Sequence, residues 1–179
     1  MDRLESWESC YYTTYSDGTT TSDLETGCLD TISAQFDGDL DDIYIFVGAV
    51  EKANSDYAYI GAYGHISVLQ TQTTSTTKAL QTSTETPSET YWYFVDGVAF
   101  GFSDIERINL ANGGCDVWDL TSDNRLCWHL VSSQTGGYRA GTNIALNFDR
   151  TTYKVLYYKN CSNPETIATP GIYAQALLI

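Results

Sequence analysis

The stretch from Leu126 to Asn160 limits the possible folds more than any other part of the chain. It begins with a strict alternation over Leu126–Val131, in which Trp128 and its leucine neighbours share one face while Cys127 and His129 share the other. An alternation with a period of two predicts a strand that buries one of its faces. Because burial of so large an aromatic side chain contributes strongly to stability, we expect Trp128 to anchor the core.

Two apolar runs upstream predict a β-hairpin. Ile43–Val50 and Tyr57–Tyr63 are both of strand length, and a short polar connector separates them. Gly48 and Gly61 lie inside these runs, where glycine usually marks a bulge or a close backbone approach. The dominance of β-branched and aromatic residues favours strands over helices here.

A second hairpin is predicted around an Asp-Gly pair, which separates Tyr91–Val95 from Val98–Phe102. Asp-Gly between apolar runs is among the strongest short-range hairpin signals. The following segment, Ser103–Leu110, is predicted to form a short helix, because Ser103 as N-cap and Glu106 three residues later match a capping box.

The recurrence of strands and turns, without an alternating βα pattern, predicts an all-β fold, an antiparallel β-sandwich or jelly-roll. Further strands are expected over residues 5–15 and Tyr153–Tyr158, and residues 16–33 are expected to be a polar loop. A length of 179 residues fits a single domain, 1–179. Residues 162–179 are expected to form either a last strand of their own sheet or an arm that pairs with a neighbouring chain.

The charge balance restricts the partners. The chain has 23 acidic and 9 basic residues, a formal net charge of -14. Such a surface repels nucleic acid and anionic lipid, and no stretch reaches the roughly 18 apolar residues of a membrane span. The N-terminal segment has no apolar run of signal-peptide length, so we expect either a signal already removed or another route of release, such as that of virus particles. These features favour an extracellular or virion-surface location.

Five cysteines, an odd number, leave at least one outside any disulfide within the chain. The local pairs Cys10–Cys28 and Cys115–Cys127 are the first candidates for disulfides, and Cys161 is then left over. The alternative is that all five are reduced and buried as small apolar residues.

One acidic motif suggests a metal. In the segment FDGDLDD, Asp37, Asp39 and Asp41 occupy alternate positions and Asp42 follows directly. Oxygen ligands with this spacing resemble the first half of a calcium-binding loop, but the glycine and the distal glutamate of an EF-hand are missing. The sequence therefore predicts either an irregular calcium site or an acidic surface turn before a strand.

The aromatic content indicates recognition. Fourteen tyrosines and four tryptophans exceed what a core of this size requires, so some should lie at the surface and stack on sugars or anchor protein contacts. Trp118 and Tyr138 lie in connections rich in glycine and aspartate, where binding sites often occur. Arg139 could add a fork of donors for hydroxyl or carboxylate groups. The alternative is that Tyr138 and Arg139 begin a strand and pair with nearby acids.

Signals for catalysis are weak. Cys127 and His129 share a strand face, but strand positions two apart lie about 7 Å from each other, too far for direct proton transfer. Acidic pairs for glycoside hydrolysis are available, as in any acidic chain. The available carboxylates are Asp104, Glu106, Asp116, Asp119 and Asp123.

The sequence therefore leads to three functional hypotheses. The preferred one is a non-enzymatic structural or surface-recognition subunit of a virion or extracellular appendage, whose partners are copies of itself, other assembly subunits or glycans. The second is a free-standing, calcium-assisted, lectin-like carbohydrate-binding module. The third is a carbohydrate-active hydrolase.

Overall fold

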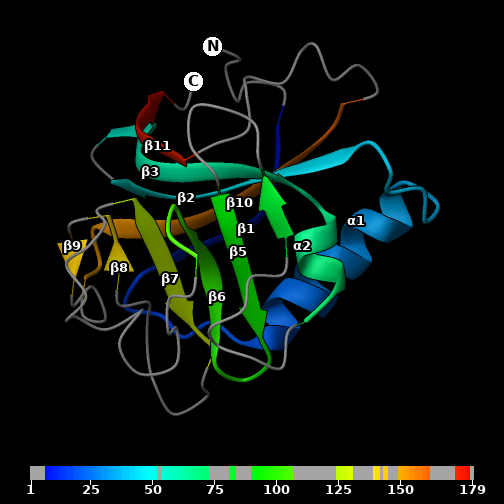
Figure 1. The fold of residues 1–179 in the computed structure, drawn as a ribbon, viewed down its shortest axis with the longest axis horizontal. Coiled ribbons are helices and arrows are strands. Elements are labelled where there is room, and N and C mark those ends of the chain that lie inside the picture. Colours follow the sequence, from blue (N-terminus) through cyan, green and yellow to red (C-terminus); the bar gives the residue numbers. More distant parts are fainter. Residues whose placement is uncertain are drawn as a thin grey trace.

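The computed structural model describes residues 7–51, 54–72, 81–83, 90–106, 124–130, 139–141, 143–144, 149–161 and 172–177. Of residues 54–57, 59, 81–83, 143–144 and 172–177 only the backbone is described. These residues form two antiparallel sheets that pack on each other (Figure 1), which confirms the predicted antiparallel β-sandwich.

The first sheet, sheet A, has the strand order β1-β10-β2-β3-β11. Its strands are β1 (Glu8–Thr14), β10 (Thr152–Asn160), β2 (Ile43–Glu51), β3 (Asn54–His65) and β11 (Ile172–Leu177). The predicted hairpin is β2 with β3. The sequence leaves two alternatives open for the C-terminal segment, a last strand of its own sheet or an arm that pairs with a neighbouring chain. The structure shows the first, because β11 pairs with β3 of its own chain.

The second sheet, sheet B, has the order β4-β5-β6-β7-β8-β9. Its strands are β4 (Gln81–Ser83), β5 (Thr90–Val95), β6 (Ala99–Ser103), β7 (Arg125–His129), β8 (Arg139–Ala140) and β9 (Asn143–Ile144). The predicted Asp-Gly hairpin is confirmed as β5 and β6, and Gly97 supplies the left-handed backbone of the turn with φ 59°.

The helix predicted from Ser103 is wrong at its start. Ser103 is the last residue of β6, and its Oγ accepts a hydrogen bond from the Ile105 amide at 3.0 Å. This bond forms a local turn that competes with a helical N-cap. The remaining part of the predicted helix, residues 107–110, lies outside the described residues.

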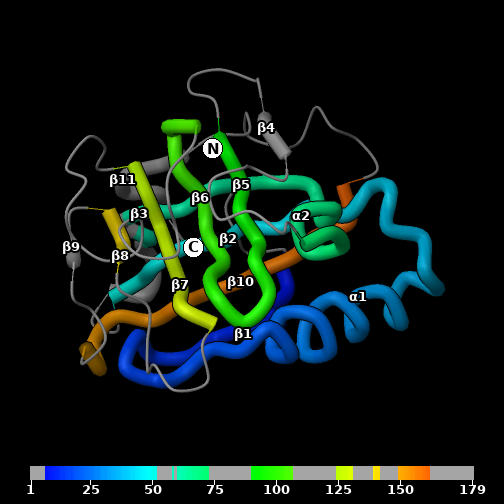
Figure 2. The backbone as a smooth tube through the Cα atoms, turned by 60° about the horizontal axis from the view of Figure 1, so that its bottom comes forward, coloured from blue at the N-terminus to red at the C-terminus, as the bar shows by residue number. Residues whose placement is uncertain are grey.

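The loop predicted over residues 16–33 is confirmed for residues 16–20 and wrong for the rest. The chain forms a π-helix, η2 (Asp23–Leu29), which continues into α1 (Asp30–Gln35), and Figure 2 shows this helical segment running beside β1. Leu24, Cys28 and Ile32 are buried at a spacing of four, so one face of the segment packs on the core. A short helix, α2 (Ser67–Gln70), follows β3.

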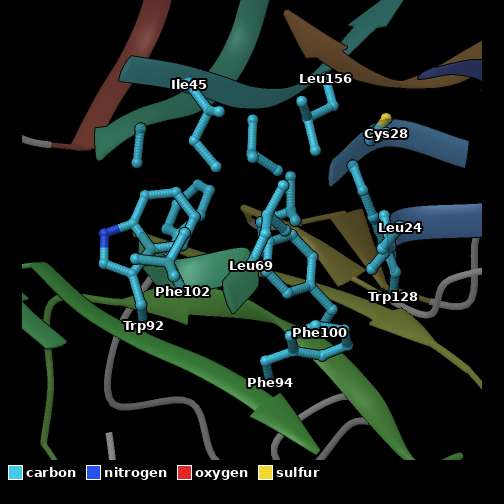
Figure 3. Close-up of a cluster of buried hydrophobic side chains, with 14 of the residues drawn as sticks. Leu24, Cys28, Ile45, Leu69, Trp92, Phe94, Phe100, Phe102, Trp128 and Leu156 are labelled. Carbon is cyan, nitrogen blue, oxygen red and sulfur yellow. The ribbon is translucent and has the colours of Figure 1, made fainter. Parts of the chain in front are cut away.

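Side chains from both sheets and from the helical segment meet in one hydrophobic core (Figure 3). The labelled members are Ile45 and Leu156 from sheet A, Trp92, Phe94, Phe100, Phe102 and Trp128 from sheet B, Leu69 from α2, and Leu24 and Cys28 from η2. The predicted alternation of β7 is confirmed, since Trp128 belongs to this core and Cys127 to a cluster on the opposite face. Trp128 is fully buried and its Nε1 donates to the Tyr15 hydroxyl at 3.1 Å.

Gly48 and Gly61 face each other across β2 and β3, and the ring of Phe46 lies against both. A Cβ on Gly61 would lie 2.1 Å from Cζ of Phe46, so the close approach predicted at these glycines is confirmed, with an aromatic ring as the neighbour. The irregularity in the register lies one step further along, between Ala49 and Glu51.

The predicted Cys10–Cys28 disulfide is confirmed and ties β1 to η2. Cys127 is also disulfide-bonded, whereas its predicted partner Cys115 lies outside the described residues. Cys161 is a buried thiol at the end of β10.

We expect replacement of Cys10 and Cys28 together by alanine to lower the free energy of unfolding by about 3 kcal/mol, because the disulfide restricts a loop of this length in the unfolded chain. Urea denaturation of the double variant measures the loss. Cys161→Ala, which breaks no disulfide, serves as the control. Coincident midpoints for the double variant and the unmodified protein would contradict the expectation.

Candidate recognition face

The strands of sheet A bury side chains on both of their faces. In β10, Leu156 and Tyr158 belong to the main core, whereas Val155 lies on the opposite, outer face in a second cluster with Phe46 and Tyr63. Six of the aromatic side chains that the structure describes on this outer face form what we call the aromatic face: Trp7, Tyr12, Phe46, Tyr63, Tyr153 and Tyr157.

The rings of the aromatic face are in mutual contact. The Tyr12 and Tyr153 rings stack, with centroids 4.6 Å apart and planes 26° apart. Tyr63 contacts Phe46 with a centroid distance of 4.9 Å and Trp7 with one of 5.4 Å. Such contacts stabilise the face and hold the rings in fixed orientations.

Exposure increases from the centre of the aromatic face toward the edge strand β1. Phe46 is fully buried and Tyr63 nearly so, whereas Tyr153 and Tyr157 are half-buried. Tyr12 is 49% exposed, and it is the one large hydrophobic side chain among the described residues that counts as exposed. Its ring is therefore available to a ligand, and stacking on Tyr153 holds the ring in place.

The central part of the aromatic face is uncharged at neutral pH. Three rows of residues cross it: Tyr157–Phe46–Tyr63, Tyr12–Val155–Gly48–Gly61 and Tyr153–Val50–Ala58. None of these residues carries a charge, in a chain with 23 acidic and 9 basic residues. The next row on the same side of the sheet, Lys159–Tyr44–His65, begins with a lysine. Burial, and to a smaller extent a neighbouring phenol, raises the pKa of Tyr12 and the pKa of Tyr157 above the ordinary tyrosine value. The phenols therefore remain protonated and able to donate hydrogen bonds.

Of the three ligand-binding residues predicted from sequence, the structure describes only Arg139, which lies in sheet B. Trp118 and Tyr138 lie outside the described residues. Arg139 is in β8, 1% exposed, and its Nε donates to the Gly141 carbonyl at 3.1 Å. This burial fits the alternative in which Arg139 belongs to a strand, and a ligand-binding role for Arg139 stays a prediction.

The four aspartates of the predicted calcium loop are exposed and lie in turns between α1 and β2. Asp37 has a left-handed φ of 52°, and the backbone carbonyl of Asp42 accepts from the Cys161 amide at 2.7 Å. Within the part of the chain that the structure describes, which includes Asp37, Asp39, Asp41 and Asp42, no three acidic, histidine or cysteine side chains group into a possible metal site. The geometry matches the acidic surface turn, and calcium stays a prediction.

Four of the candidate catalytic groups, Cys127, His129, Asp104 and Glu106, lie within the described residues. Cys127 is disulfide-bonded and so has no thiol for a dyad with His129. The Asp104 carboxylate accepts from the Asn124 amide at 3.0 Å, and Glu106 is exposed. The other candidate carboxylates, Asp116, Asp119 and Asp123, lie outside the described residues.

Sequence reasoning missed the aromatic face, although one signal for it was present. Tyr153, Val155 and Tyr157 alternate with the core residues Leu156 and Tyr158 along β10, so both faces of this strand are apolar or aromatic. A strand with one solvated face would instead alternate with polar residues. An aromatic outer face therefore follows from the sequence once the strand is placed.

Comparisons of the chain with protein-family models, with curated proteins and with solved structures find no match. None of the helices that the structure describes is long and apolar enough to cross a membrane. Fold and site together define an acidic antiparallel β-sandwich with an aromatic face on one sheet.

Proposed function

We propose that this protein is a non-enzymatic recognition subunit of a virion or extracellular appendage, and that it contacts its partner through the aromatic face. The observation that carries the proposal is the half-exposed Tyr12, stacked on Tyr153 where the neighbouring rows of the sheet contain no charged residue. Tyrosine combines a flat apolar ring with a polar tip, which suits both sugars and protein contacts.

The second candidate function, a lectin-like carbohydrate-binding module, is favoured by the small size of the exposed part. A stable protein interface covers about 800 Å² on each partner. The described face offers one exposed and a few half-buried rings, which better fits one or two sugar units. Two copies of a chain with net charge -14 also repel each other at low ionic strength.

We expect Tyr12→Ala to reduce binding to the partner at least tenfold and to change the free energy of unfolding by no more than about 1.5 kcal/mol, the value of one aromatic pair. A neutral-glycan array and sedimentation velocity, run on the same samples, measure glycan binding and self-association. Tyr12→Phe is the matched control, since it keeps the stacked ring and removes only the hydroxyl.

The two readouts separate the candidates. Oligomers that dissociate in Tyr12→Ala support the assembly subunit, and a monomer whose glycan binding is lost in Tyr12→Ala supports the lectin. If Tyr12→Ala changes neither self-association nor glycan binding, the aromatic face is not the recognition surface.

A further inference from the structure

Lys154 is a lysine whose side chain is fully buried inside the sandwich. It lies on the inner face of β10, between Tyr153 and Val155 of the outer cluster. Its Nζ donates to the Asp17 carbonyl at 2.7 Å and to the Thr19 hydroxyl at 2.5 Å. The Tyr15 ring lies on another side of the amine, with its centroid 5.7 Å from Nζ.

These contacts attach one short segment to the rest of the sandwich. This segment, which we call the linker, comprises residues 15–20 between β1 and the helical segment. The Tyr15 hydroxyl accepts from Trp128 of sheet B, and the Thr19 hydroxyl accepts from Tyr11 at 2.9 Å. The amine of Lys154 is therefore at the centre of a polar cluster that joins β1, β10, the linker and β7.

The protein supplies little charge to balance an ammonium at this position. The partners of Nζ are a carbonyl, a hydroxyl and a ring, and no carboxylate within the described residues forms an ion pair with it. Asp17 and Asp23 are the charged groups that act on it, from the linker and from the start of η2. Burial outweighs their attraction and lowers the pKa of Lys154 to about 7.

We propose that Lys154 is a proton switch for the linker: the linker closes on an uncharged amine and opens more readily when that amine can take up a proton. Opening here means that the linker moves away from Lys154 and lets water reach Nζ. The linker can do this locally, because it is short and Asp17 and Gly18 are already exposed.

The direction of the effect follows from the proton balance. When Nζ is hydrated, its pKa returns toward the ordinary lysine value of about 10.4. Between about pH 7 and pH 10 the open form therefore binds one more proton than the closed form, and opening becomes up to tenfold more favourable for each unit of falling pH. Below about pH 7 both forms are protonated and the effect levels off. Tyr11 remains neutral throughout this range, since burial raises its pKa to about 12.

The first test measures the charge directly in the unmodified protein, so it does not depend on a variant that folds. The chain has four lysines, Lys52, Lys78, Lys154 and Lys159, so a sample labelled with 13C at lysine Cε should show four resonances. We expect one of them to titrate near pH 7. If none of the four titrates in that range, Lys154 is charged in the closed form and the proposal is overturned.

The second test measures opening by amide hydrogen exchange at Tyr15 and Ser16, whose amides donate to the Thr152 and Asp149 carbonyls. After correction for intrinsic exchange, their protection should fall up to tenfold per pH unit from pH 9.5 to pH 7. Lys154→Met should abolish this dependence, and Lys159→Met, on the same strand and partly exposed, should leave it unchanged. Protection that is independent of pH in the unmodified protein would overturn the proposal.

Discussion

Trp128→Ala is expected to lower the free energy of unfolding by about 3–5 kcal/mol, the largest loss of any single substitution considered for this chain. The Trp128 side chain is fully buried and contacts the rings of Tyr11 and Phe100, with centroids 5.9 Å and 5.6 Å away. Its removal leaves a cavity between the sheets and deprives the Tyr15 hydroxyl of its donor.

Urea denaturation measures this loss, and Trp128→Phe separates its two causes. Phenylalanine keeps most of the ring and removes the N–H group, so we expect a loss of about 1–3 kcal/mol for that variant. A Trp128→Ala protein that unfolds within 1 kcal/mol of the unmodified protein would show that the sheets do not pack around this side chain.

Gly101→Ala is expected to cost about 3 kcal/mol or more, at the upper end of overpacking effects. Gly101 lies on the central strand β6 opposite Cys127 of β7. A Cβ at this position would lie 2.1 Å from the Leu126 carbonyl oxygen and 3.0 Å from Cα of Cys127. Because both neighbours are backbone atoms, relief requires the two strands to move apart and weakens their pairing.

The matched control for Gly101 is Gly18→Ala. A Cβ on Gly18 meets no atom within 4 Å, and the residue does not have a left-handed φ. We expect this substitution to change the free energy of unfolding by less than about 1 kcal/mol. Equal effects of the two substitutions in thermal unfolding would contradict the steric explanation.

Much of the fold could be predicted because several strands carry strong local signals. The Asp-Gly turn before β6 and the alternation around Trp128 both specify structure within a few residues, and both are confirmed. Alternation does not tell to which sheet a strand belongs, however. The strands β7 and β10, close in sequence, lie in different sheets of the sandwich.

The helical segment could not be predicted as easily, because its local composition opposes a helix. Residues 19–31 contain several threonines, aspartates and a glycine, which favour turns over helices. What stabilises the helix is tertiary: Leu24 and Ile32 enter the core, and the disulfide from Cys28 holds it against β1. Packing of this kind overrides weak propensity.

The aromatic face lies in a different class of segment from the residues that the sequence favours. Trp118 and Tyr138 lie in connections, where sites often occur, whereas the described aromatic cluster is mostly on regular strands. Sequence could show that β10 is apolar on both faces. It could not show that Tyr12, from the opposite end of the chain, would stack on Tyr153, because that contact depends on the pairing of β1 with β10.

The pairing of β1 with β10 also determines when sheet A can complete its folding during translation. The hairpin of β5 and β6 joins neighbouring segments and can form soon after both leave the ribosome. By contrast, β1 finds its partner only after most of the chain has been translated, since Glu8 pairs with Tyr158. The nascent protein must therefore carry an unpaired, aromatic first strand for most of its translation, and this strand is where we expect chaperones to bind first.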